Sequence, residues 1–200
     1  MPKIKAGSVA EHVARQEAAV FDAAITLFTE RGFDAVSLGD IAAAVGLARN
    51  SLYRYFPDKA HILLRWFARE LPAEVQRSRE LLSGPEPARE RIWRWAVARL
   101  DYAKTPEHAL IANLSSVVPE LDDAARAELA DSHRQLQAPL DAALRDAGIR
   151  RPADRTVIAE LIGALVLATA QQEAARDGMG RANHAARTHL RRAIDGLLAG

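Results

Sequence analysis

The stretch from residue 37 to 59, SLGDIAAAVGLARNSLYRYFPDK, constrains the fold of this chain more than any other segment. Ser37 stands where a helix N-cap is needed, and Asp40, three residues later, completes the pattern of a capping box. Apolar residues recur at helical spacing until Gly46, the residue type that most easily ends a helix in a left-handed conformation. A second short helix is predicted at about residues 48–53. Two short helices joined by a tight glycine turn are the layout of a helix-turn-helix.

The residues on either side of this motif predict a small N-terminal domain, residues 1–58. An amphipathic helix is predicted over residues 9–31, and the helices of the motif would pack against it. Pro57 ends the motif, and Asp58 can cap a further helix whose first residue is Lys59. The predicted core of the three helices consists of Phe28, Phe33, Leu38, Ile41, Leu52 and Phe56.

The run IAAAVGLARNSLYRYFPDK, residues 41–59, resembles the DNA-binding signature of the TetR family of tetracycline-repressor-type regulators. The usual pattern of that family is roughly I-A-x-x-A-G-V-S-x-G-T-L-Y-x-Y-F-x-S-K. The residues that match it outright are Ile41, Ala42, Gly46, Leu52, Tyr53, Tyr55, Phe56 and Lys59. Ala48 departs from it by replacing a capping serine, at a cost of about 1 kcal/mol. Asn50 departs from it by replacing a glycine, which adds a side chain able to reach a base edge.

The second short helix of the motif carries the side chains that we expect to contact DNA. The candidates for base edges and nearby phosphates are Arg49, Asn50, Ser51 and Arg54. Arginine suits the two acceptors of guanine and asparagine suits adenine, although an ordinary solvated helix face would also be polar. The resemblance implies that Tyr53, Tyr55 and Lys59 contact the sugar-phosphate backbone, and Ser37 could do so from a helix N-terminus. The tyrosine rings could instead be core aromatics.

The remaining residues, 59–200, show helical periodicity and no strand pattern, which predicts an all-α chain. Helices are expected at about 59–82, 88–104, 121–147, 152–177 and 181–199, with a shorter one between Thr105 and Pro119. Pro72 is expected to bend or split the first of these, and Pro139 to kink the helix at 121–147. The resemblance implies that these residues form a helical domain for effector binding and dimerisation.

Composition and charge limit the other classes of protein. The 200 residues contain no cysteine, so a disulfide framework and a thiolate metal site are excluded. The N-terminus lacks the apolar segment of a signal peptide, and the most apolar run, 161–170, is too short to cross a bilayer. We therefore expect a soluble, cytoplasmic protein without a membrane partner. The net charge of +1 does not by itself indicate a nucleic-acid binder. The basic residues of the motif form a local positive patch within this nearly neutral chain.

The histidines and carboxylates give no support for catalysis. The six histidines are scattered, and the sequence holds neither an E-x-x-H pair nor an H-E-x-x-H zinc site. It also lacks a glycine-rich phosphate loop and a nucleophile elbow. We expect no enzyme activity, no cofactor and no metal.

The last two predicted helices carry wide apolar faces. The candidate dimer-interface residues are Leu161, Leu165, Ala168, Leu190, Ile194 and Leu197. Periodicity predicts only that these faces are buried, and a core within one chain would satisfy it equally well. The resemblance implies that the two helices pack against those of a second copy as a four-helix bundle. Two recognition helices related by a twofold axis would then enter major grooves about 34 Å apart, at a near-palindromic site.

A small-molecule effector is implied by the resemblance but not identified. Candidate pocket residues on the middle helices are Trp93, Trp95, Tyr102, His108, Asn113 and His133. The helix at 59–82 would couple an effector to the spacing of two DNA-binding heads. The predicted function is a ligand-responsive transcriptional regulator, in particular a repressor, that binds double-stranded DNA as a homodimer. The alternative is a helical small-molecule-binding or enzymatic protein whose helix-turn-helix is only structural.

Overall fold

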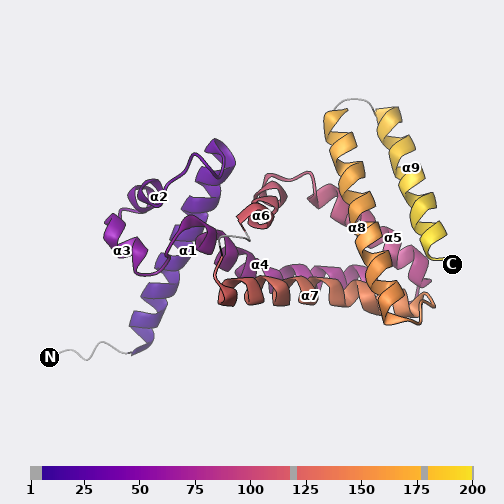
Figure 1. Ribbon diagram of the computed structural model, residues 1–200, viewed down its shortest axis with the longest axis horizontal. Coiled ribbons are helices and arrows are strands. Elements are labelled where there is room, and N and C mark those ends of the chain that lie inside the picture. The colour runs from indigo at the N-terminus through magenta and orange to yellow at the C-terminus, as the bar shows by residue number, and fades with distance from the viewer. Residues whose placement is uncertain (1–5, 118–120, 177–179, 200) are drawn as a thin grey trace. The chain divides into compact units, whose positions relative to one another are not determined.

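The computed structural model describes residues 6–117, 121–176 and 180–199, and these residues form helices and connecting turns without a strand (Figure 1). The all-α prediction is therefore confirmed. The helices are α1 (Ala6–Arg31), α2 (Leu38–Ala44), α3 (Arg49–Tyr53), α4 (Lys59–Leu82), α5 (Ala88–Tyr102), α6 (Pro106–Val117), α7 (Asp123–Asp146), α8 (Pro152–Ala175) and α9 (Gly180–Leu197). Within these described ranges, no helix combines the length and the apolar content that crossing a bilayer requires.

Pro72, expected to bend or split its helix, and Pro139, expected to kink its helix, lie inside α4 and α7. Neither helix is split, and a bend or kink remains a prediction. Leu71 and Val75, on either side of Pro72, are both buried, so α4 packs on both sides of the proline. Pro139 is likewise followed by the fully buried Leu140. Packing of the flanking turns outweighs the hydrogen bond that a proline removes from a helix.

The chain divides into two compact units. The first comprises Met1–Arg69 with Leu110–Arg126, and the second comprises Glu70–Ala109 with Ala127–Gly200. The first unit reaches beyond residue 58 because Arg65 of α4 pairs with Glu17 of α1 at 3.3 Å, and Arg69 pairs with Asp22 at 3.8 Å. The start of α4 thus packs with the N-terminal helices, and the predicted boundary at residues 58 and 59 remains a prediction.

The core of the first unit is built from α1, the helix-turn-helix and the start of α4. Every predicted core residue is buried, namely Phe28, Phe33, Leu38, Ile41, Leu52 and Phe56. Phe21 of α1 meets Phe56 edge-on with ring centroids 5.8 Å apart, and Phe28 lies 5.0 Å from Phe33. These ring contacts hold α1 against both ends of the helix-turn-helix.

The core of the second unit is formed mainly by α5, α7, α8 and α9, and α8 lies beside α9 (Figure 1). Its most deeply buried side chains include Ile92, Leu100, Leu140, Leu144, Ile162, Val166, Leu190 and Ile194. Leu190 and Ile194 were predicted as dimer-interface residues. They are only 3% and 1% exposed because they fill the space between helices of the same chain, so the structure assigns them to its own core.

A buried ion network joins α8 to α9 and to the end of α5. The side chain of Glu173 is 3% exposed and accepts hydrogen bonds from Arg187 at 2.8 Å and Lys104 at 2.9 Å. Asp101 accepts from the same two cations at 2.8 Å and 3.0 Å. The hydrogen bond from Arg187 lowers the pKa of Glu173, with a further contribution from Lys104.

We expect Glu173→Gln to lower the free energy of unfolding by about 1–3 kcal/mol, because it leaves two cations without their buried partner. This range allows for the partial exposure of Arg187 and Lys104, which reduces the contribution of each pair. Urea denaturation followed by circular dichroism would measure the change.

Asp101→Asn is the matched control, because the Asp101 side chain is 54% exposed and its loss should cost less. The pH dependence gives a second readout. Because the pKa of folded Glu173 lies below the ordinary 4.5, its stabilising effect is complete above that pH and is lost as the pH falls. The wild-type protein and Glu173→Gln should therefore converge in stability as the pH falls. A difference in stability that does not change with pH would contradict the role of the Glu173 charge.

Candidate nucleic-acid interface

The turn between α2 and α3 has the geometry that the sequence predicted. Ser37 Oγ accepts from the Asp40 amide at 3.2 Å, and the Asp40 carboxylate accepts from the Ser37 amide at 2.8 Å, which completes the capping box. Gly46 has a φ of 68°, and the Leu47 amide then donates back to Ala42 at 2.8 Å. This left-handed step turns the chain sharply enough for a second helix to begin three residues later, at Arg49.

Helix α3 turns one apolar side chain inward and a polar face outward. Leu52 is completely buried, whereas Arg49, Asn50 and Arg54 are exposed and Ser51 is half-buried. Ala48 at the N-cap makes no side-chain hydrogen bond, as the substitution of the capping serine predicted. A helix-turn-helix that served only for packing would be expected to bury this face, so its exposure favours a surface for DNA.

Arg49 and Tyr53 form a pair on the exposed face of α3. Arg49 Nη2 donates to the Tyr53 hydroxyl at 2.8 Å, and the guanidinium carbon lies 5.3 Å from the centre of the tyrosine ring. This hydrogen bond raises the pKa of Arg49, so the guanidinium stays charged. The sequence analysis missed the pair, although residues four apart on a helix are neighbours and the spacing could have indicated it.

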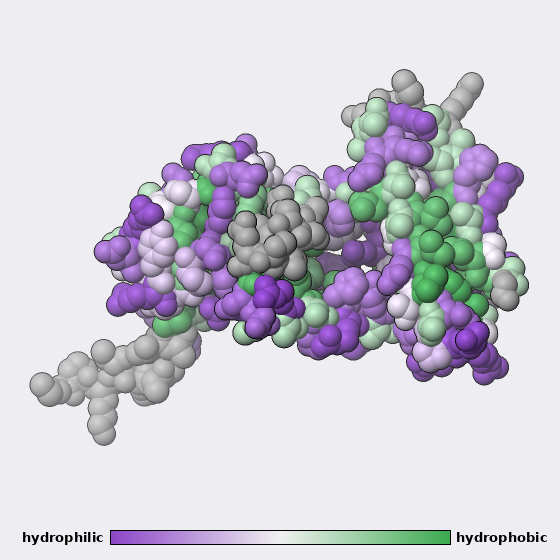
Figure 2. Space-filling view, viewed as in Figure 1, coloured by the Kyte–Doolittle hydropathy of each residue, from purple (hydrophilic) through white to green (hydrophobic). Residues whose placement is uncertain are grey.

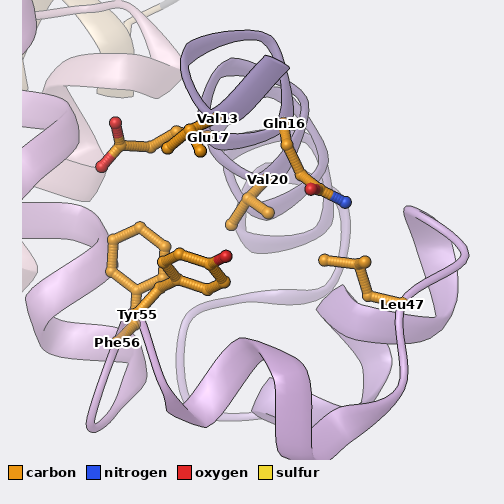
Figure 3. Close-up of a pocket in the computed structure, with 7 residues that line it drawn as sticks. All are labelled: Val13, Gln16, Glu17, Val20, Leu47, Tyr55 and Phe56. Atoms are coloured by element: carbon orange, nitrogen blue, oxygen red, sulfur yellow. The ribbon is translucent and has the colours of Figure 1, made fainter. Parts of the chain in front are cut away.

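Tyr55 lies beside a small apolar hollow between α1 and the segment that follows α3 (Figure 3). The hollow is lined by Val13, Gln16, Glu17, Val20, Leu47, Tyr55 and Phe56. Tyr55 is 48% exposed, and within the described residues its hydroxyl has no hydrogen-bond partner. The ring packs against the domain and the hydroxyl is left free, so a contact between this tyrosine and DNA remains a prediction.

Lys59 and Ser37 have partners within the chain. Lys59 Nζ donates to the carbonyl oxygens of Phe33 at 2.6 Å and Asp34 at 3.1 Å, and lies 4.5 Å from the centre of the Phe33 ring. Two of the three ammonium hydrogens are therefore engaged, which leaves one for a phosphate. Ser37 Oγ also donates to Asp40 at 2.5 Å, so this hydroxyl is occupied by the capping box.

The candidate effector residues are only partly brought together. The Tyr102 and His108 rings meet edge-on, with centroids 5.5 Å apart. Burial lowers the pKa of His108, and the positive charge of Arg99 lowers it further. Trp95 is a buried core residue whose indole donates to Ser78 at 3.2 Å. Trp93 packs at the edge of the same core, and His133 is exposed on α7. The side chain of Asn113, in α6, lies outside the described part of the structure.

Once the buried Leu190 and Ile194 are set aside, the exposed candidates for the dimer face lie on α8. Leu161 is 45% exposed, Ala168 is exposed, and Leu165 is half-buried. Val157 and Leu167 on the same helix are 53% and 41% exposed. Figure 2 shows apolar surface over α8 and α9. Leu165 on α8 and Leu197 on α9 are both partly buried and pack against the core of their own unit.

We expect Lys59→Ala to lower the free energy of unfolding by about 1–2 kcal/mol, because two carbonyl oxygens lose a charged donor. Thermal unfolding would measure it, with Arg54→Ala as a control that removes an exposed cation without such contacts. If Lys59→Ala had the same melting temperature as the wild-type protein, the ammonium group would not contribute to the stability of the fold.

Comparison with known proteins identifies the N-terminal segment. A family model described as bacterial regulatory proteins, tetR family, matches residues 20–65, which include α2, α3 and parts of α1 and α4. The HTH-type transcriptional repressor KstR of Mycolicibacterium smegmatis is 32% identical over 82 residues, 40% of this chain. The matched stretch spans only 39% of the length of that curated relative.

Solved structures extend the likeness in fold to most of the chain. The TetR family transcriptional regulator PfmR from Thermus thermophilus has a TM-score of 0.61 at 25% identity, over 90% of this chain and 97% of that one. A putative transcriptional regulator from Saccharomonospora viridis, solved in complex with choline, has a TM-score of 0.68 at 21% identity, over 91% of this chain and 96% of that one. The family signature lies on the helix-turn-helix described above, and over residues 20–65 the chain matches the tetR family of bacterial regulatory proteins.

Proposed function

We propose that this protein is a ligand-responsive transcriptional repressor that binds a near-palindromic DNA operator as a homodimer. The observation that carries the proposal is the outward polar face of α3, held on a helix-turn-helix that the tetR-family model matches. A helix presented in this way fits a major groove. The repressor function of KstR supports the direction of regulation.

The proposed DNA contacts divide into two groups. Arg49, Asn50 and Ser51 read base edges, and Arg54 serves a base or a nearby phosphate. Tyr53, Tyr55 and Lys59 serve the backbone, whereas Ser37 would have to exchange its two hydrogen bonds to Asp40 for a phosphate. The free hydroxyl of Tyr55 is the best placed because its ring is already anchored. Backbone contacts set the register of the helix and base contacts set its sequence preference.

The homodimer is proposed from the exposed apolar face of α8. Val157, Leu161 and Leu167 are each more than 40% exposed on one helix, whereas large apolar side chains at such positions are usually covered in an interface. The opposite side of α8 packs in the core of its own chain through Ile162 and Val166. A second copy brought against this face by a twofold axis would bury both faces together.

Effector binding is proposed for the second unit, where Tyr102 and His108 form an aromatic pair with a polar edge. The choline complex of the Saccharomonospora viridis protein supports a small-molecule ligand in a protein of this fold. Helix α4 belongs to the first unit up to Arg69 and to the second from Glu70 onward. An effector that favours one orientation of α4 would change the affinity of the dimer for DNA.

Gel-shift binding to the DNA that flanks its own coding region tests the DNA function. We expect the full chain to bind a fragment of this DNA with a Kd of about 10⁻⁸–10⁻¹¹ M at physiological salt, and metabolites extracted from cells to release it. Asn50→Ala should alter preference at one base pair, whereas Tyr55→Phe should weaken binding evenly on all sequences.

Equal affinity for flanking and unrelated DNA would exclude an operator and favour the alternative of a merely structural helix-turn-helix. Specific binding that no metabolite changes would leave a DNA-binding protein without an effector, and would contradict the ligand-responsive part of the proposal.

Sedimentation equilibrium tests the dimer. Wild-type protein should have the mass of two chains, and Leu161→Arg should have the mass of one, because a charge buried in an apolar interface is strongly unfavourable. Val13→Arg places the same charge on a comparably exposed apolar residue of α1 and should stay dimeric. A wild-type mass of one chain would exclude the dimer, and a dimeric Leu161→Arg would move the interface away from this part of α8.

A further inference from the structure

The contact between Arg49 and Tyr53 separates Arg49 from the other polar side chains of α3. Within the described residues, the side chains of Asn50, Ser51 and Arg54 make no hydrogen bond, whereas Arg49 donates to the Tyr53 hydroxyl at 2.8 Å. We infer that Tyr53 is a positioning residue that holds Arg49 for recognition of a single guanine in each half of the operator. This inference rests on the function proposed above and assigns the base-reading role within it.

An exposed arginine benefits from being held before it binds. Its long side chain loses rotamer freedom when a contact fixes it, and that loss opposes binding. Tyr53 is suited to fix it because its ring has only two rotatable bonds and follows the completely buried Leu52 on a well-anchored turn. A guanidinium that is already oriented loses less freedom when it meets a base, so affinity for the correct base rises.

The hydrogen bond to Tyr53 leaves Arg49 able to recognise guanine. A guanidinium has five N–H donors, and Nη2 contributes one hydrogen to each of its two paired edges. Donation of one Nη2 hydrogen to Tyr53 therefore leaves the other edge complete. That edge can donate two parallel hydrogen bonds to the O6 and N7 atoms of guanine, the pairing typical of arginine in the major groove.

Gly39 in the first turn of α2 leaves room for this arrangement. A Cβ built at Gly39 would lie 3.9 Å from Arg49 Cδ, so the arginine stem runs past the glycine. A longer side chain at this position would compete for the same space. The stem of Arg49 thus passes an open position on α2, and the Tyr53 hydroxyl on α3 is the contact that holds the guanidinium.

The test uses the full chain and an operator selected from random duplex DNA. Affinities are measured by fluorescence anisotropy for the selected duplex and for all its single base-pair variants. The wild-type protein should lose about fivefold or more in affinity when one particular G·C pair per half-site is replaced. Arg49→Ala should abolish that dependence, and Arg49→Lys should reduce it, because lysine can reach guanine but lacks the rigid paired donors.

Tyr53→Phe is the decisive variant, because it keeps the ring and removes the hydroxyl that accepts from Arg49. It should reduce the penalty at the same G·C pair by at least half on a logarithmic scale while retaining the wild-type preference elsewhere. Tyr55→Phe, the matched loss of a hydroxyl that Arg49 does not contact, should keep the full penalty. Tyr53 is 42% exposed, so the fold of its variant should persist, and thermal unfolding would verify this.

Two results would overturn the inference while leaving the proposed function intact. If Tyr53→Phe weakened binding by the same factor on every duplex, Tyr53 would contact only the backbone. If Arg49→Ala kept the full dependence on the G·C pair, another residue would read it. Failure to select any sequence would instead overturn sequence-specific DNA binding itself, and this inference with it.

Discussion

The burial of Leu52 is the constraint on which the proposed DNA-binding surface depends. Helix α3 has five residues and no side-chain cap, so it is far too short to be stable by itself. Its conformation is imposed by Leu52, which is completely buried, and by Phe56, which follows it and packs edge-on against Phe21 of α1. Because these two apolar residues face inward, the polar residues between and beside them must face solvent.

The same domain uses several polar contacts to fix the backbone around that helix. The capping box of Ser37 and Asp40 sets the start of α2, and Lys59 binds two carbonyl oxygens of the α1–α2 connection. These contacts explain why residues that the family pattern associates with DNA also have structural partners here. A side chain can keep its contact within the chain and also bind DNA only where it has a free donor. Lys59 has a third ammonium hydrogen and Tyr53 a hydroxyl hydrogen for this.

The second unit shows two different uses of apolar helix faces. Helix α8 is apolar on nearly every side, but Ile162 and Val166 pack inside the chain while Val157 and Leu161 remain exposed. One end of this helix is held by the buried Glu173, whose partners come from α9 and from just beyond α5. The face left uncovered is therefore presented on a helix whose position is fixed by its own core and by charge pairing.

Much of this architecture could be predicted from local sequence. Capping residues, Gly46 and the spacing of apolar residues predicted the helix-turn-helix, and all six predicted core residues from Phe28 to Phe56 are buried, although the equally buried Val36 and Ala42 were not among them. Local signals succeed here because caps, turns and helical faces each depend on residues only a few positions apart. Pro72 did not end its helix, since α4 is unbroken and packs on both sides of the proline.

Sequence by itself determined that the chain is helical, that a short polar helix follows a glycine turn, and which residues that helix offers. Only tertiary structure decided which apolar faces are shared within one chain, as Leu190 and Ile194 are, and which are left exposed, as Leu161 is. It also decided that Arg49 is held by Tyr53 and Lys59 by backbone carbonyls. Periodicity records that a face is apolar or polar, whereas the partner of that face depends on which distant segments fold against it.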